Sequence, residues 1–271
     1  MAIKADFHLH SSFSGDSKTP MEEMIQAAIK KGLTHICFTE HNDMDYPYQP
    51  GEEGMFDINT DSYLYELLKL KAKYENQIKV LFGIELGLQP HLKRDFAIYT
   101  KNHDFDFIIG SSHVVNGVDP YYPKFFEGKT DQQAYREFLE AELTCIQKIP
   151  FFNVYGHLDY VVRYGTSKNQ NFSYQAYADL IDEILKTLIE EEKGIELNTA
   201  GFREGLGQPN PCADIIKRYR ELGGEIITVG SDAHEAANVG ADFDKASDIL
   251  TACGFKYYAI FEGRTPEYFK I

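Results

Sequence analysis

One stretch of the sequence decides the fold: Ala5-Asp6-Phe7-His8-Leu9-His10-Ser11-Ser12. Its apolar beginning predicts a β-strand, and a loop rich in Ser, Gly and Asp follows it. Side chains two residues apart on a strand point to the same side, so His8 and His10 face one point at the carboxyl end of this strand. Two neutral imidazoles aimed at one point are typical of a metal site. Taken alone, the pair is explained equally well by two packed histidines on an ordinary strand.

Apolar strands and helical segments alternate along the rest of the chain. Further strands are expected at residues 34–39, 79–85, 105–113, 153–157, 195–198 and 225–230, with a last short one at 257–261. Helices are expected at residues 21–31, 60–74, 92–102, 130–149, 173–193, 211–222 and 243–253. This alternation predicts an α/β fold with a parallel sheet and helices outside it.

A closed barrel and an open doubly wound sheet both satisfy that pattern. An open sheet gathers its ligands at one switch point, whereas a barrel collects residues from the carboxyl ends of all its strands. Here nearly every strand ends in a polar residue of a metal-binding type, which favours the barrel. The length of 271 residues suits one barrel domain, and no repeat or linker divides the chain, so residues 1–271 are expected to form a single domain.

Composition restricts the functional classes. The formal charge of −15 argues against a surface that binds nucleic acid non-specifically, although bound cations would still admit a phosphate substrate. Four scattered cysteines, without a Cys-x-x-Cys pair, are expected to be buried thiols. The chain start lacks the apolar core of a signal peptide and no run reaches the length of a membrane span, so a cytoplasmic protein that binds no membrane is expected.

Nine residues with metal-binding side chains fall at or just past predicted strand ends. They are His8, His10, Asp16, His41, Glu85, His113, His157, Asp232 and His234. Each alone has an ordinary structural explanation, but nine at the same end of successive strands indicate a site for more than one ion, because nine ligands are too many for one. Three ions bridged by a carboxylate would use them all. The remaining histidines, 35, 91 and 103, lie elsewhere and are interpreted as structural or surface residues.

Two other kinds of site are excluded by their missing motifs. The paired serines lack the Gly-x-Ser-x-Gly turn of a serine nucleophile. The glycine-rich segment 201–207 lacks the Lys-Ser/Thr ending of a nucleotide-binding loop.

The order of the motifs resembles that of the PHP (polymerase and histidinol phosphatase) family across essentially the whole chain. The matching motifs are Asp6-Phe7-His8-Leu9-His10-Ser11, Thr39-Glu40-His41, Gly83-Ile84-Glu85, Ser112-His113, Gly156-His157 and Ser231-Asp232-Ala233-His234. Within the family, the segments 105–113 and 195–203 and the total length are similar to those of the histidinol-phosphate phosphatase branch. The resemblance implies a distorted (β/α)7 barrel with a trinuclear metal site at the carboxyl ends of its strands.

The resemblance also implies how the ligands are shared among three divalent ions. His8, His10, Glu85 and Asp232 would hold the first ion. Glu85 would bridge to a second, completed by His113 and His157, and the third would be held by Asp16, His41 and His234. Other members often have histidine where Asp16 stands. A carboxylate there tilts that position toward manganese, iron or magnesium and away from zinc, so zinc, manganese and iron all stay open.

The implied reaction is hydrolysis of a phosphate monoester, L-histidinol phosphate to L-histidinol and phosphate in histidine biosynthesis, with hydroxide bridging the metals as the nucleophile. Arg163 and Arg203 are candidates to bind the phosphate oxygens, although a solvated loop arginine explains Arg163 nearly as well. Asp16 or His234 is the candidate to pass a proton to the leaving alkoxide.

The rest of the substrate is expected to contact two further segments. The irregular segment 44–59 is a candidate lid, in which Asp45, Glu52 and Glu53, with Asp43 just before it, would contact the ammonium and imidazole groups. Asn198 is a further candidate substrate-binding residue.

Two alternatives remain open at this point. A phosphodiesterase, nucleotide-processing exonuclease or other small-molecule phosphatase would use the same metal site. A non-catalytic metal-binding or regulatory domain is a different class, although intact ligand motifs argue against it. The acidic charge and the lack of a basic or base-stacking groove weigh against a nucleic-acid partner. The expected partner is a small phosphate ester, and the expected assembly is a monomer or weak homo-oligomer.

Overall fold

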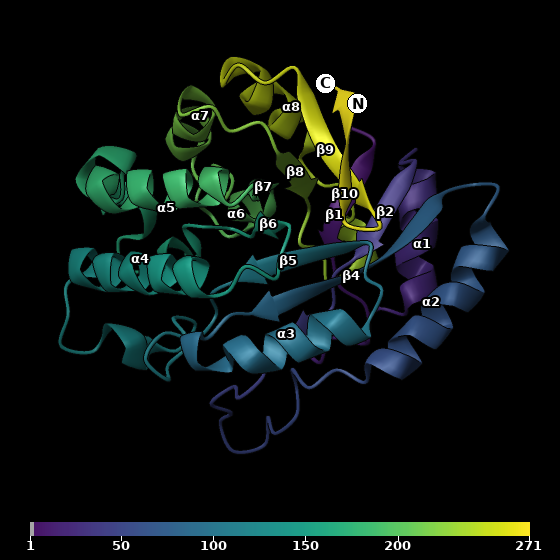
Figure 1. The fold of residues 1–271 in the computed structure, drawn as a ribbon, viewed down its shortest axis with the longest axis horizontal. Helices are drawn as coiled ribbons and strands as arrows, with labels where there is room; N and C mark the ends of the chain where they lie inside the picture. Colours follow the sequence, from purple (N-terminus) through teal and green to yellow (C-terminus); the bar gives the residue numbers. More distant parts are fainter. Residues whose placement is uncertain (1–2) are drawn as a thin grey trace.

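The computed structural model describes residues 3–271 and contains a parallel sheet that follows the predicted order (Figure 1). Seven strands pair in sequence: β1 (Ala5–Leu9), β2 (His35–Phe38), β4 (Lys79–Gly87), β5 (Phe107–Ser111), β6 (Val154–Tyr155), β7 (Gly194–Asn198) and β8 (Ile227–Gly230). The short strand β3 (His41–Asn42) also pairs with β4, opposite Glu85 and Leu86. Every pairing in this sheet is parallel, as the alternation of strands and helices predicts.

The sheet closes on itself between β8 and β1. The Asp232 amide donates to the His8 carbonyl at 2.7 Å, and the His10 amide donates to the Ala233 carbonyl at 2.9 Å. The buried carboxylate of Asp6, on β1, also accepts hydrogen bonds from the amide and the hydroxyl of Ser231. The expectation of a distorted seven-stranded barrel is therefore confirmed, and its carboxyl-end rim carries the residues in question.

Helices cover the outside of the sheet (Figure 1). They are α1 (Met21–Lys30), α2 (Thr60–Tyr74), α3 (Lys93–Asn102), α4 (Asp131–Lys148), α5 (Ala178–Glu190), the single turn α6 (Ala200–Arg203), α7 (Ala213–Glu221) and α8 (Phe243–Ala252). Local sequence sets their limits: Thr130 and Gln133 form a capping box at the start of α4. Helix α5 buries Ile181, Ile184, Leu185 and Leu188, a spacing that brings all four side chains onto one face.

A hairpin at the end of the chain differs from the single strand expected there. It consists of β9 (Tyr257–Glu262) and β10 (Thr265–Lys270), paired antiparallel. The Phe261 ring contacts the Phe107 ring of β5 at 5.1 Å between centroids. The turn of the hairpin donates to Asp106, which lies just before β5, from the amides of Gly263 and Arg264. The hairpin therefore packs at the amino end of β5, opposite the rim that carries the candidate ligands.

Two irregular loops cross above the carboxyl ends of the strands. The first rim loop (residues 44–59) follows β3, as predicted, and the second rim loop (residues 114–129) follows β5 and contains the short helix η2 (Pro123–Phe126). The Tyr46 hydroxyl donates to Asp119 at 2.7 Å, and the Tyr122 hydroxyl donates to Glu52 at 2.6 Å. Each loop thus contributes one tyrosine and one carboxylate, and the two loops are joined twice.

Cys37, Cys145, Cys212 and Cys253 are all buried and unpaired with one another, as expected. Within residues 3–271, no helix is both long and apolar enough to cross a membrane.

Candidate metal centre and active site

Glu85, at the carboxyl end of β4, lies at the centre of the predicted ligand set. Its side chain is fully buried and contacts five histidines from four segments. The Oε1 atom lies 3.0 Å from His157 Nε2 and 3.3 Å from His113 Nε2. The Oε2 atom lies 3.1 Å from His41 Nδ1, 3.2 Å from His8 Nε2 and 3.6 Å from His10 Nε2. His8 and His10 therefore turn to one point, as the spacing on β1 predicts.

The other carboxylates complete the cluster toward the barrel mouth. Asp232 Oδ1 lies 3.5 Å from His10 Nε2. Asp16 Oδ2 lies 3.0 Å from His234 Nε2 and 3.4 Å from His41 Nε2. The His10 ring is stacked against both His41 and His234, each with centroids 4.3 Å away. The fold therefore brings all nine predicted residues into one continuous cluster.

The donor set of this cluster fits divalent cations. Four groups of three side chains each offer ligand atoms within 4.8 Å of one another: His8, His10 and Asp232; His8, Glu85 and His157; His41, Glu85 and His113; and His10, His41 and His234. Within residues 3–271, His8 Nε2, His10 Nε2 and Glu85 Oε2 are buried and have no hydrogen-bond partner. Such atoms are costly to leave unpaired, and imidazole nitrogen with carboxylate oxygen suits zinc, manganese and iron.

These four groups differ in part from the division implied by the family resemblance. His8, His10 and Asp232 stay together as expected. His41, however, groups both with Glu85 and His113 and with His10 and His234, because its two ring nitrogens face different carboxylates. The assignment of each ligand to a particular ion stays a prediction.

Carboxylates outside the cluster fix the orientation of two histidine rings. His8 Nδ1 lies 2.6 Å from Glu196 Oε1, and His113 Nδ1 lies 2.6 Å from Asp43 Oδ1. A carboxylate that accepts from one ring nitrogen leaves the other nitrogen free for a metal and raises its basicity. Asp43 lies at the cavity wall as well, but this oxygen is engaged by His113.

A serine and a buried glutamate orient His10 in the same way. Ser14 Oγ lies 3.1 Å from His10 Nδ1 and donates its own proton to Glu40 at 2.6 Å. The sequence interpretation missed Glu196, Glu40 and Ser14 as orienting residues. The signal was present for Glu196, since a charged residue stands between two apolar ones inside the strand Ile195–Asn198.

The charges of the cluster shift its pKa values in opposite directions. Burial opposes ionisation of Glu85, but His8 and His113 beside it hold the pKa of that carboxyl well below its usual value. Burial and the neighbouring His41 lower the pKa of His10 to about 3. The ionised Glu85 and the neutral His10 are in the forms that metal binding requires. Burial opposes protonation of His113, but Asp43 and Glu85 raise its pKa to about 10, so binding of a cation would displace a proton from this ring.

A cavity of about 590 Å³ opens above this cluster. Its inner wall includes Asp16, His41, His113, His157, Asp232 and His234. Arg163 and Arg203 line one side, and Tyr46, Glu52, Tyr121 and Tyr122 of the two rim loops line the mouth. This volume is in the range of small-molecule sites.

The two predicted arginines lie in this cavity wall with different surroundings. Arg163 is buried, and its Nη1 lies 3.2 Å from Asp232 Oδ2. Arg203 donates from Nη2 to the carbonyls of Ser231 and Asp232, whereas its Nη1 is buried without a partner among the described residues. Asn198 is fully buried, is absent from the cavity wall and donates to Glu196 and Asp232, so its position favours support of the site over contact with substrate.

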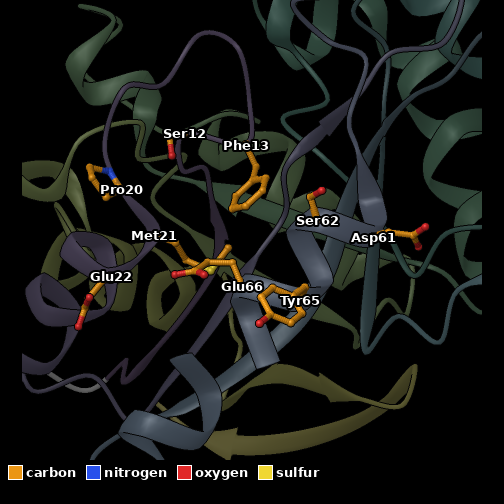
Figure 2. A pocket seen from close by; sticks show the side chains of 9 residues that line it. All are labelled: Ser12, Phe13, Pro20, Met21, Glu22, Asp61, Ser62, Tyr65 and Glu66. Carbon is orange, nitrogen blue, oxygen red and sulfur yellow. The ribbon is translucent and has the colours of Figure 1, made fainter. Parts of the chain in front are cut away.

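A second cavity, of about 570 Å³, opens between the starts of α1 and α2 (Figure 2). It is lined by Ser12, Phe13, Pro20, Met21, Glu22, Asp61, Ser62, Tyr65 and Glu66. Glu22 is paired with Lys73, and Glu66 is paired with Lys69. Since none of the nine ligand candidates lines it, the cavity above Glu85 is the candidate active site.

The sequence and the fold are similar to those of known proteins. The sequence model of a family described as PHP domain matches residues 6–200. The chain is 34% identical to the histidinol-phosphatase of Lactococcus lactis subsp. lactis, over 96% of this chain and 95% of that protein. It is 33% identical to the probable histidinol-phosphatase of Clostridium acetobutylicum, over 97% of this chain and 98% of that protein.

A solved structure extends this similarity to the fold. The crystal structure of the Lactococcus lactis histidinol phosphate phosphatase, in complex with zinc, L-histidinol and phosphate, has a TM-score of 0.90 and 33% sequence identity to this chain. The alignment covers 97% of this chain and 98% of that one.

Proposed function

The chain belongs to the PHP family, and we propose that it is a metal-dependent phosphatase that hydrolyses L-histidinol phosphate to L-histidinol and phosphate. The relative of known structure holds zinc, L-histidinol and phosphate together, which supports both the metal and the products. This reaction belongs to histidine biosynthesis. We propose further that the protein is cytoplasmic, that it is monomeric or weakly self-associated, and that its partner is a small phosphate ester.

One observation carries the proposal: buried ligand atoms without partners lie next to a cavity that is lined by further ligand candidates and by two guanidinium groups. His8 Nε2, His10 Nε2 and Glu85 Oε2 are the buried atoms without partners, and Arg163 and Arg203 are the cations. Imidazole and carboxylate bind divalent metals, while guanidinium matches the geometry of phosphate oxygens. A phosphate ester is the substrate class that uses both features.

Three divalent ions would use all nine ligand candidates, with Glu85 at the centre of the set. When bound, the ions would turn water into a strong nucleophile at neutral pH and stabilise the negative charge that develops on the phosphate. Zinc is supported by the relative's structure, whereas the carboxylate of Asp16 favours manganese or iron at the outer position, next to His41 and His234.

The protein's own side chains bind the phosphate and supply a proton. Arg163 and Arg203 hold the non-bridging oxygens, and the free Nη1 of Arg203 is available for this contact. His234 is paired with Asp16, and both are partly exposed at the cavity wall, with 29% and 33% of their side-chain surfaces accessible. Their place at the cavity wall makes Asp16 or His234 the candidate to pass a proton to the leaving alkoxide.

Four acidic residues in or next to the first rim loop are candidates to bind the remainder of the substrate. Of these, Glu52 is the best placed. Asp43 is engaged by His113, and Asp45 pairs with the exposed His91 outside the cavity. Glu53 accepts from the Gly51 amide and is absent from the cavity wall, whereas Glu52 lines the mouth together with Tyr122. A carboxylate at this place suits the cationic groups of histidinol.

The decisive experiment measures phosphate release from a panel of monoesters, diesters and oligonucleotides, with metal content determined on the same sample. The proposal predicts turnover of L-histidinol phosphate and loss of turnover after every divalent ion is removed. Preferred cleavage of diesters would indicate a phosphodiesterase instead. Full activity without divalent ions would refute the metal mechanism, and metal binding without any turnover would indicate a regulatory domain.

A further inference from the structure

Asn210 lies beneath the site and contacts Arg163, yet nothing in the sequence motifs pointed to it. Its side chain is completely buried. Its Oδ1 accepts a hydrogen bond from Arg163 Nε at 2.9 Å, and its Nδ2 donates to Asp159 Oδ1 at 2.5 Å. We propose that Asn210 is a positioning residue that holds the Arg163 guanidinium toward the phosphate. This inference rests on the proposed phosphatase function.

Backbone hydrogen bonds on both sides fix the position of the Asn210 side-chain amide. The amide and carbonyl of Asn210 pair with the carbonyl and amide of Asn198, at 2.9 and 2.8 Å, at the end of β7. Asp159 is itself fixed, because its Oδ2 accepts from the Cys212 amide at 2.9 Å. Asp159 also directly precedes η3 (Tyr160–Arg163), the short helix that carries the arginine.

The order of donors and acceptors requires an amide at position 210. The Asp159 carboxylate can only accept, so the NH₂ group of Asn210 must face it. The carbonyl oxygen of the amide then faces Arg163, which can only donate. A carboxylate at 210 would lie against Asp159, and an amide at 159 would allow the Asn210 side chain to rotate and point NH₂ at the guanidinium.

The remaining contacts of Arg163 show what this orientation achieves. Nη2 faces Asn198 Oδ1 and Asp232 Oδ2, while Nη1 contacts only Asp232 among the described residues. Since Nη1 carries two N–H groups, one is left for an anion in the cavity. Without Asn210, the Nε–H would lose its buried acceptor, and the orientation of the guanidinium would no longer be fixed from the Nε side.

Asn210 also lies against the turn that carries the second arginine. A Cβ at Gly201, in α6, would lie 2.9 Å from Asn210 Oδ1 and 2.4 Å from the Gln208 carbonyl. Glycine is therefore required at 201 for α6 to pack here, and the segment 208–210 supports both Arg163 and Arg203.

The test is binding of inorganic phosphate to the zinc-loaded protein, measured by calorimetry and by competition with substrate. Asn210→Leu keeps the size of the side chain and removes the acceptor. We expect phosphate binding to weaken roughly 10-fold, the scale of one hydrogen bond to a charged group. Asn210→Asp restores an acceptor for Arg163 but repels Asp159, and it should lie between Asn210→Leu and the unaltered protein. If Asn210→Leu does not fold, Asn210→Asp takes its place in the measurement, and it too should bind phosphate more weakly than the unaltered protein.

A double-mutant cycle with Arg163→Ala separates positioning from general damage. If Asn210 acts through Arg163, Asn210→Leu has little further effect in the Arg163→Ala background. Equal weakening in both backgrounds, or unaltered phosphate binding in the single variant, overturns the proposal. Asn153→Leu is the matched control: Asn153 bonds to Ile108 and Arg264 at the amino end of the barrel, so its loss should lower thermal stability without changing phosphate affinity.

This measurement is independent of the identity of the ester. If the unaltered protein binds phosphate but does not hydrolyse L-histidinol phosphate, the proposed substrate is wrong and the role of Asn210 is still decided by the cycle. If the unaltered protein binds no phosphate, the role of Asn210 is refuted.

Discussion

The Nδ1 atom of His8 lies 2.6 Å from the Oε1 atom of Glu196, and both side chains are buried. The second oxygen of Glu196 accepts from the His157 amide at 3.0 Å. One carboxylate on β7 therefore holds a ligand candidate on β1 and the backbone of another ligand candidate after β6. Glu196 thus ties together three neighbouring parts of the carboxyl-end rim.

The first prediction concerns this carboxylate. Glu196→Gln removes the charge that fixes the His8 ring, so we expect zinc affinity to fall roughly 10- to 100-fold, as for other residues that orient metal ligands. Metal titration against a chromophoric chelator measures this. Glu190→Gln, at the exposed end of α5, is the control and should bind zinc like the unaltered protein. An unchanged affinity in Glu196→Gln would contradict the role given to Glu196.

The second prediction compares two neighbouring residues of the first rim loop. Glu52→Gln should raise KM for L-histidinol phosphate roughly 10-fold, because it weakens one charged contact to the substrate, while hydrolysis of a small aryl phosphate stays nearly unchanged. Glu53→Gln, whose side chain bonds within residues 3–271 only to the backbone of its own loop, should change neither reaction. Equal losses on both substrates in Glu52→Gln would show that the loop does not recognise the cationic group.

The third prediction concerns the metal preference of the outer position. Asp16→His replaces an oxygen donor beside His41 and His234 with a nitrogen donor. We expect the ratio of bound zinc to bound manganese to rise several-fold when the metal-free protein is loaded from an equal mixture of the two. Mass spectrometry of the metals gives the ratio directly. A lower ratio of zinc to manganese would mean that Asp16 does not ligate an ion.

The fourth prediction concerns stability and pH, through a residue that takes no part in the proposed reaction. Glu142 is buried on α4, and burial raises the pKa of its carboxyl well above the usual value of 4.5. The folded protein therefore binds a proton that the unfolded chain releases above pH 4.5. The resulting stability is fully present below that pH and is lost as pH rises toward the folded-state pKa, at up to about 1.4 kcal/mol per pH unit.

Glu142→Gln keeps a neutral side chain of the same shape and removes this titration. Its melting temperature should exceed that of the unaltered protein at pH 8, and the difference should shrink toward pH 4.5. Thermal unfolding across that range measures the effect. A difference that does not change with pH would show that Glu142 is not protonated in the fold.

The sequence predicts this fold well where local signals and burial agree. The helix expected at 60–74 begins and ends at those residues, and Asn59 caps it by accepting from the Ser62 amide. The strand expected at 153–157 is reduced to Val154–Tyr155, because the residues that follow turn away to place His157. Strand β10 was missed, since Pro266 and its mostly exposed, polar neighbours are not typical of a buried strand.

The sequence predicted which nine side chains would cluster, but not which residues support them. Alternation along β1 and polar strand ends identify residues such as His8 and Glu85 without any three-dimensional information. Neither pattern reveals that Asn210, 47 residues from Arg163 in sequence, accepts its hydrogen bond. Contacts of this kind depend on which distant loops come together in the fold, and the local periodicity of a single sequence does not show this.

The junction between β1 and β8 has a consequence for synthesis of the protein. His8 and Asp232 are joined by a backbone hydrogen bond, although they are 224 residues apart in the chain. A nascent polypeptide that has not yet released β8 from the ribosome exposes the unpaired edges of β1 and β7, and such edges invite pairing with other chains. The candidate cation site thus forms only after nearly all of the polypeptide has been translated, and ions taken up earlier would meet an incomplete set of ligand candidates.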